Sequence, residues 1–170
     1  MITITSDGVD KLIDKYNADI EELTDEINNR AVYTAAVTED EKELAPAFDF
    51  CDTVKSIEIL EDKVIKLKHA RAMFNTTTEV YNGMTVDMCL TRMNMIMRQK
   101  GMYAKYAKKL PKERVNSRLQ ATKEIEYVYT NYEISDAKRK YMALQDELLE
   151  IRKALNVVNS SKEFEVDIDM

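Results

Sequence analysis

Residues 9–27 of the chain read VDKLIDKYNADIEELTDEI, and this stretch decides the fold class. Its apolar residues follow one another at alternating distances of four and three positions: Val9, Ile13, Tyr16, Ile20, Leu23 and Ile27. This spacing is typical of a narrow apolar seam along one helix that packs against another. Ser6 and Asp7 precede the seam, and their side-chain oxygens are suited to cap a helix N-terminus. We therefore predict a long helix that ends near Asn28.

Three further segments, near residues 57–74, 86–109 and 135–158, carry seams of the same kind. Their seam residues are Ile57, Leu60, Val64, Leu67 and Phe74, then Val86, Leu90, Met93 and Met97, then Ala137, Tyr141, Leu144, Leu148, Ile151, Leu155 and Val158. Arg71 stands at one seam position and should lie at an end of the bundle or meet a carboxylate, because an unpaired buried charge is costly. The pattern predicts a mainly α single domain over 1–170: an antiparallel bundle of about four long helices, arranged as two helical hairpins.

The connections between these helices differ in character. Residues 31–52 lose the period and hold a run of carboxylates, so we expect an exposed acidic connection. Residues 75–83 read NTTTEVYNG and predict a break, after which Thr85 caps the next helix. Alternating apolar residues predict short strands at 125–130, in the 160–170 tail and near Ile2 and Ile4, with their pairing left open.

Composition and charge narrow the class of protein. The chain has 170 residues, of which 45% are hydrophobic and 33% charged, with only three Gly and two Pro, a balance that favours long helices. Two cysteines, no signal-peptide pattern and no apolar run of about 20 residues predict a cytoplasmic protein that is not embedded in a membrane. The net charge is −6, yet residues 1–52 carry −10 and residues 98–123 carry +8. These two blocks could attract one another within a subunit or between subunits.

Sites for catalysis, metals and cofactors are not apparent in the sequence. The single histidine, His69, lacks a Glu three positions earlier, as a di-metal carboxylate bundle would need, and is better explained as a solvated surface residue. The acidic cluster at residues 21–26 is better explained as a solvated helix face. Cys51 and Cys89 lack zinc-site partners and are interpreted as packing residues. We therefore predict no enzyme activity, no metal and no cofactor.

A basic segment at residues 98–123 supports an alternative function, nucleic-acid binding. Its cations are interleaved with Tyr103 and Tyr106, a combination that suits phosphate contacts with some aromatic stacking. The residues assigned to this alternative are Arg98, Lys105, Lys108, Lys109, Arg114 and Arg118. The acidic character of the whole protein counts against it, since the N-terminal third is an available counterpart for these cations.

The middle of the chain carries short motifs at the predicted break and beyond it. These are Asn75-Thr76-Thr77-Thr78, then Gly83, Thr85, Leu90 and Arg92, then Glu124-Ile125 and Asn159. With them the chain resembles a small uncharacterised bacterial family that is sometimes labelled septicolysin-like. It departs from the family pattern at Asn82 and Asn94, where Asp is expected, and at Ser160, where Trp is expected. The resemblance implies a helical-hairpin protein without an assigned activity; the label implies pore formation, which no membrane-insertion pattern supports.

The motif residues at the break supply a second alternative, a small-ligand or enzyme site formed by Asn75, Thr78, Thr85 and Arg92. The competing interpretation is structural: Asn75 ends one helix, Gly83 makes the turn and Thr85 caps the next helix.

The leading hypothesis rests on a second apolar stripe on the segment 86–109. Met88, Met95 and Met102 recur every seven residues, flanked by Cys89, Ile96 and Tyr103, on the side opposite Val86. A helix that is apolar on two sides is normally buried on both. Either the connection 31–52 folds over this stripe, or a second subunit covers it through Met88, Met95, Ile96 and Met102. We predict a homo-oligomer, most simply a dimer, that acts without catalysis through contacts with an unknown protein partner.

Overall fold

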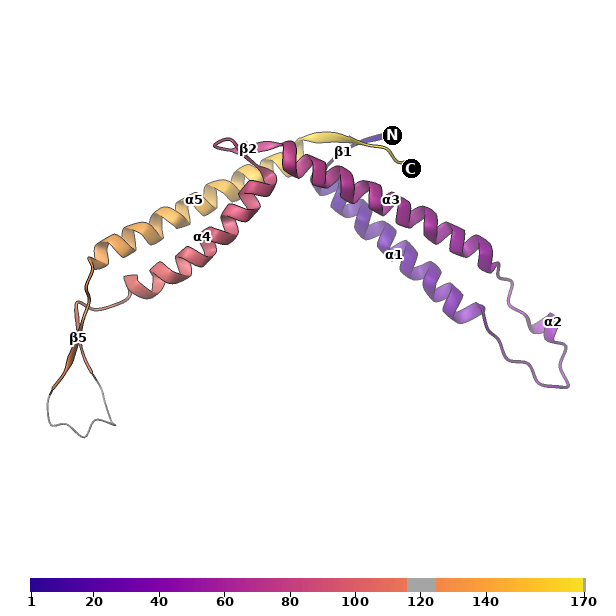
Figure 1. Cartoon of the computed structure of the whole chain (residues 1–170). Coiled ribbons are helices and arrows are strands. Elements are labelled where there is room, and N and C mark those ends of the chain that lie inside the picture. The colour runs from indigo at the N-terminus through magenta and orange to yellow at the C-terminus, as the bar shows by residue number, and fades with distance from the viewer. Residues whose placement is uncertain (116–124, 170) are drawn as a thin grey trace. The chain divides into compact units, whose positions relative to one another are not determined.

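A computed structural model of the chain describes residues 1–115 and 125–169 (Figure 1). This part is mainly helical, with five helices and three two-stranded sheets, so the prediction of a mainly α chain with short strands is confirmed. The chain divides into two compact units. The first comprises Met1–Thr77 together with the chain from Val157 onward, and the second comprises Thr78–Asn156.

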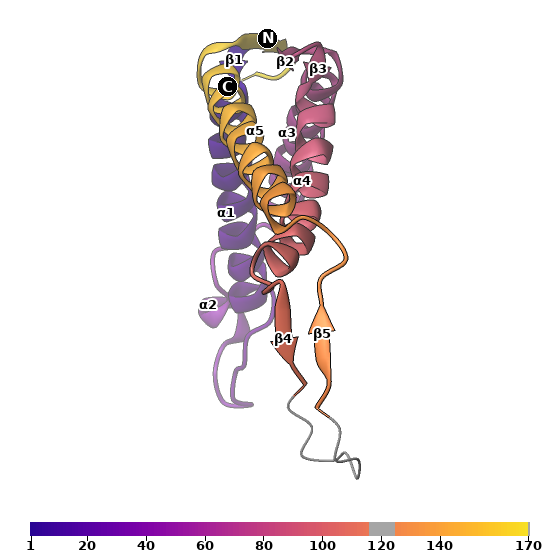
Figure 2. The same cartoon turned by 90° about the vertical axis from the view of Figure 1, so that its left-hand side faces the viewer.

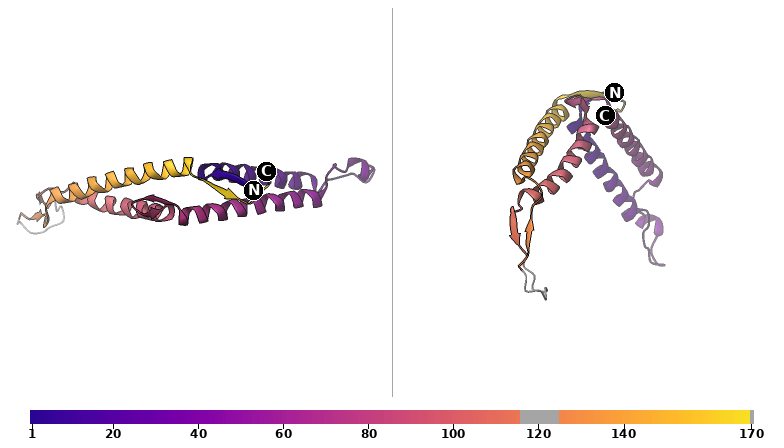
Figure 3. Two further views of the ribbon diagram at one scale, coloured as in Figure 1. Left: turned by 90° about the horizontal axis from the view of Figure 1, so that it is seen from above. Right: turned by 60° about the vertical axis from the view of Figure 1, so that its left-hand side comes forward.

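The first unit is built on the long helices α1, Ser6–Arg30, and α3, Phe50–Thr77. The two lie side by side along their length (Figures 1 and 3). They are antiparallel, because Asp10 pairs with Arg71 and Lys63 lies over the ring of Tyr16. Arg71 thus meets a carboxylate, one of the two alternatives predicted for it. Both predicted seams are confirmed, and they supply most of the core: Val9, Ile13, Tyr16, Val64 and Leu67, joined by Val166 and Ile168.

The ends of the chain pair with one another in this unit. Strand β1, Ile2–Thr5, runs antiparallel to β6, Glu163–Val166, so both predicted terminal strands are confirmed. The ring of Phe164 stacks on that of Phe74, with centroids 4.6 Å apart, and joins the small sheet to α3. The cap of α1 is Thr5, whose hydroxyl accepts a hydrogen bond from the Gly8 N–H, rather than the predicted Ser6 or Asp7. Ser6 is instead buried in the first turn.

The segment between α1 and α3 is exposed, as predicted for the acidic connection. It contains only a single short helix, α2, Glu41–Leu44, capped by Asp40. The Tyr33 hydroxyl donates a hydrogen bond to the Glu41 carbonyl, which links the start of this segment to α2. Helix α3 then begins at Phe50, two residues before the predicted end of the connection.

The second unit is built on α4, Val86–Ala107, and on α5, Ile134–Ser161, up to Asn156. These helices are also antiparallel neighbours (Figure 2), because Arg92 pairs with Glu147 while Lys100 lies over the ring of Tyr141. The predicted seam of α5 is confirmed. Its buried members in this unit are Ala137, Leu144, Leu148, Ile151 and Leu155.

Two small hairpins flank α4. Strands β2, Glu79–Tyr81, and β3, Met84–Thr85, enclose Asn82 and Gly83, whose φ values of 47° and 76° suit the Asn-Gly pair of a tight hairpin turn. Beyond α4, β4, Lys112–Arg114, pairs antiparallel with β5, Tyr127–Tyr129. The strand predicted at 125–130 is thus confirmed over three residues.

The seam predicted for α4 is wrong in part. Leu90 and Met97 are 44% and 46% exposed, whereas Cys89 and Ile96 are fully buried. From Val86, apolar residues continue to Leu90 and Met97 on one face of the helix and to Cys89 and Ile96 on another. Both series keep the spacing of three, four or seven residues that is typical of a seam. The spacing alone therefore fits two faces of the helix, and tertiary packing selects the one that contains Cys89 and Ile96.

No helix in residues 1–115 and 125–169 is both long enough and apolar enough to cross a membrane.

Candidate interaction surface

The outer side of α4 carries the stripe that the sequence singled out. Met88, Met95 and Met102 are 52%, 55% and 47% exposed, so about half of each side chain meets solvent. In a unit built on two long helices, each helix packs against one long neighbour. The side of α4 that is buried in this unit contains Cys89 and Ile96 and does not contain the stripe. The three methionines therefore form a surface, which we call the methionine stripe.

One residue that the sequence assigned to this surface lies elsewhere. Ile96 is fully buried, and so is Cys89 in the same seam, which the sequence analysis interpreted as a packing residue. Ile96 was therefore wrongly assigned to an oligomer interface, because no part of its side chain is accessible to a second molecule. Leu90 and Met97, which were predicted to lie in the seam, are instead exposed. They add apolar surface on the other flank of the seam.

The residues proposed for a ligand site at the break have structural roles. Thr85 caps α4, because its hydroxyl accepts a hydrogen bond from the Met88 N–H at 3.4 Å. Thr78 is buried, and its carbonyl accepts from the Val86 N–H at 3.0 Å. Asn75 belongs to the first unit and does not end its helix, since α3 continues to Thr77. The capping interpretation is thus confirmed for Thr85.

Arg92, the fourth of these residues, is engaged by α5. Its Nε and Nη2 atoms donate to the two carboxylate oxygens of Glu147 at 2.7 and 2.8 Å. This bidentate pairing raises the pKa of Arg92. The edge of the guanidinium that carries Nε and Nη2 is therefore occupied by Glu147. One turn farther along α5, the Glu150 carboxylate accepts from the Tyr81 hydroxyl at 2.8 Å and raises the pKa of Tyr81. The sequence showed no signal for either carboxylate, because neither stands in a motif.

A shallow groove of about 320 Å³ runs beside the Arg92–Glu147 pair. Its lining comes from both long helices of the second unit: Arg92, Gln99, Tyr103, Lys140, Ala143, Leu144 and Glu147. The volume is at the lower end of the range for ligand pockets. Arg92 and Glu147 are already paired with each other, and the further charged residue of the lining is the exposed Lys140.

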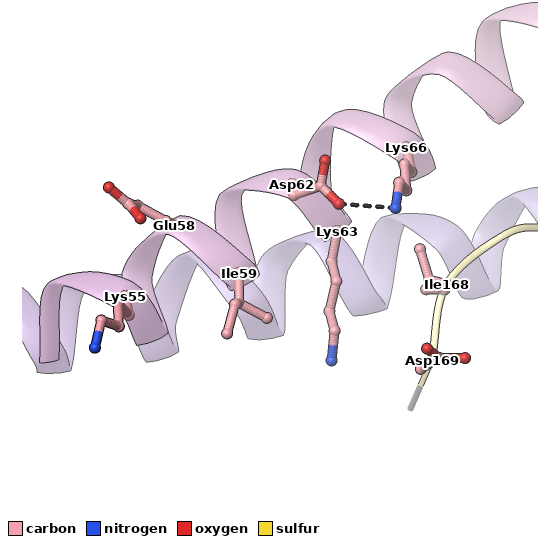
Figure 4. A pocket seen from close by; sticks show the side chains of 8 residues that line it. All are labelled: Lys55, Glu58, Ile59, Asp62, Lys63, Lys66, Ile168 and Asp169. Carbon is pink, nitrogen blue, oxygen red and sulfur yellow. Dashed lines mark ion pairs between the residues drawn. The ribbon is translucent and has the colours of Figure 1, made fainter. Parts of the chain in front are cut away.

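The first unit has a groove of about 440 Å³ between α3 and the C-terminal segment (Figure 4). Ile59 and Ile168 provide its apolar part, and Asp62 accepts from Lys66 at 2.8 Å, which raises the pKa of Lys66. Three lysines and three carboxylates line this groove, so its charges balance. Among the described residues no group of three possible metal ligands occurs in either unit.

The remaining candidate residues lie on the surface or outside the described part. Arg98, Lys105, Lys108 and Lys109 are exposed on α4 and its end, and Arg114 is exposed on β4, whereas Arg118 lies outside the described residues. His69 is exposed, as predicted. Of the two free cysteines, Cys89 is buried, which raises its pKa, whereas Cys51 is exposed and is not the packing residue expected.

The fold and its surfaces define a mainly helical protein made of two antiparallel helix-pair units. No protein-family model matches the chain, and no curated protein matches it. The chain is similar to a solved structure described as that of a functionally unknown conserved protein from Corynebacterium diphtheriae, with a TM-score of 0.55 and 14% sequence identity. The match covers 96% of this chain and 100% of that one. At this identity the similarity concerns the fold alone.

Proposed function

We propose that the protein is a non-enzymatic helical protein that acts by self-association, most simply as a homodimer, and through contacts with protein partners. The observation that carries the proposal is the half-exposure of the methionine stripe at a strict seven-residue spacing. Methionine side chains are flexible and polarisable, so such stripes make adaptable contact surfaces. Contiguous exposed apolar surface is a common mark of a protein–protein interaction site.

The spacing of the stripe suits a two-fold symmetric contact. Met95 lies midway between Met88 and Met102, about 10.5 Å from each along the helix axis. Two antiparallel copies of α4 would therefore place Met95 against its counterpart on the symmetry axis, and Met88 against Met102 of the other copy. Such an arrangement is self-complementary, as the most common class of homodimer requires.

The test is sedimentation velocity or light scattering at tens of micromolar protein, since the mass of a weak dimer depends on concentration. We expect a dimer for the wild type and a monomer for Met95→Asp, which places two carboxylates together on the axis. Asn94→Asp is the matched control, because it adds the same charge to the neighbouring exposed position and should leave the dimer intact. A wild-type protein that stays strictly monomeric overturns the proposal, as does dissociation by the control alone.

Three related expectations belong to this proposal. The first is the antiparallel four-helix bundle predicted from the seams, supported by the antiparallel pairing of the long helices within each unit. The second is a relationship with the septicolysin-like family, supported by the hairpin architecture of each unit and by the motif residues around Thr85. The third is a cytoplasmic location, supported by two free cysteines, one of them exposed.

A further inference from the structure

The β4–β5 hairpin gathers cations and aromatic rings on one of its faces. Lys112 is directly opposite Tyr129 in the register, and Arg114 is directly opposite Tyr127. Opposed residues of an antiparallel pair point to the same side, and alternate residues along a strand share a side. These four residues therefore form one face, which we call the cation–aromatic face. Glu113 and Val128, which is opposite it, form the other face.

The arrangement within this face is specific. The Lys112 ammonium lies 4.0 Å from the ring centroid of Tyr127 and 5.4 Å from that of Tyr129. The two centroids are 6.4 Å apart, and the ring planes are tilted by 51°. The rings remain accessible, since Tyr127 is 43% and Tyr129 63% exposed. A positive charge thus lies between two exposed aromatic platforms.

The base of the hairpin is joined to the end of α4, and the strands extend away from it (Figures 1 and 2). The Tyr132 hydroxyl donates to the Tyr106 carbonyl at 2.8 Å, and the Thr130 N–H donates to the Pro111 carbonyl at 3.2 Å. The last turn of α4 and the chain that leads from it into the hairpin carry three further exposed cations: Lys105, Lys108 and Lys109.

The unit that contains the hairpin carries a net positive charge, and the other unit carries a net negative charge. Residues 78–156 contain fifteen Lys and Arg against ten Asp and Glu, a net of +5, so the rest of the chain carries −11. At physiological salt a charge is felt over about 8 Å. A bound polyanion would therefore respond to the local positive surface and not to the net charge of −6.

We propose that the cation–aromatic face binds single-stranded nucleic acid, independently of the self-association proposed above. Bases stacked in a helix follow one another at about 3.4 Å along a strand. Rings 6.4 Å apart and tilted can instead each receive one base of an extended strand, with the intervening phosphate close to the Lys112 ammonium. Duplex bases are not available for this stacking. An acidic protein segment would engage the cations but leave both rings unused.

The experiment is fluorescence anisotropy with a labelled single-stranded oligo-dT of about 12 nucleotides, within the 4–16 that small binding folds cover. Lys112→Ala combined with Arg114→Ala should weaken binding and reduce the slope of log affinity against log salt by about 1.4, at about 0.7 for each lost phosphate contact. The matched control is Lys11→Ala with Lys15→Ala, which removes the same charge from α1 and should leave affinity and slope unchanged.

The aromatic contribution has its own variant. Tyr129→Ala should weaken binding about 5- to 150-fold, the equivalent of losing one stacked base. Val128→Ala, on the opposite face of the same strand, should bind like the wild type. Circular dichroism checks that each variant keeps its helices.

Several outcomes overturn the proposal. One is no binding by the wild type at low salt, and another is equal affinity for the wild type and the Lys112/Arg114 double variant. Equally tight binding of poly-glutamate, with no effect of Tyr129→Ala, would show that the face recognises an acidic protein instead. A clear preference for duplex over single-stranded probe would contradict the stacking geometry. None of these outcomes alters the mass measurement that tests self-association through the methionine stripe.

Discussion

The register of α4 can be tested by truncating two neighbouring residues that the helix turns in opposite directions. Ile96 is fully buried and Met95 is 55% exposed. Ile96→Ala removes buried methyl and methylene groups and leaves a cavity, so we expect a loss of about 2–5 kcal/mol in the free energy of unfolding. Met95→Ala removes atoms that are largely hydrated already, so we expect a change within about 0.5 kcal/mol.

The assay is urea unfolding followed by far-UV circular dichroism, at a protein concentration low enough to exclude self-association. Thermal melting provides a second measurement, in which Ile96→Ala should lower the midpoint by about 4–20 °C, at 2–4 °C per kcal/mol for a chain of this size. Equal destabilisation by the two substitutions would refute the register, and so would a larger effect of Met95→Ala. A loss confined to Ile96→Ala places that residue in the core of the second unit.

Three further predictions concern the cap, the ion pair and the cysteines. Thr85→Ala should destabilise by about 0.5–1 kcal/mol through loss of the α4 cap, with Thr85→Ser close to wild type; chemical denaturation measures both, and an unchanged midpoint contradicts the capping role. A double-mutant cycle with Arg92→Ala and Glu147→Ala should give a coupling of about 1 kcal/mol, high for a partly exposed pair because it is bidentate; a coupling of zero shows that the pair is not formed in solution. In the native protein a thiol reagent near neutral pH should modify Cys51 quickly and Cys89 only after unfolding, because burial excludes the reagent from Cys89 and raises its pKa; simultaneous modification of both contradicts the buried position.

The seams of α1, α3 and α5 could be predicted from the sequence because their apolar residues occupy one narrow stripe. On α5 every predicted seam position from Ala137 to Leu155 is buried or half-buried. A single stripe admits a single packing face, so local spacing and tertiary structure agree. The same logic left two alternatives for Arg71, an end of the bundle or a carboxylate partner, and the structure shows the second.

Helix α4 shows where local spacing stops being sufficient. Its apolar residues extend around more than one side, so Leu90 and Ile96 fitted the seam equally well by spacing. Which of them is buried depends on the neighbouring helix, and no local pattern encodes that choice. The short strand β4 also escaped prediction, because Lys112, Glu113 and Arg114 show no apolar alternation and are held in place by their partner β5.

The sequence by itself determined the helical class, the capping residue Thr85, the turn at Asn82 and Gly83, and the division of charge along the chain. These features depend on backbone preferences and on periodicity over a few turns, which act between residues close in the chain. Only the tertiary structure decided which side of α4 is exposed, that Glu147 engages Arg92, and that Lys112 lies between two tyrosine rings. Each of these joins residues that are distant in sequence, and their contact is set by how helices and strands pack, which a linear pattern does not specify.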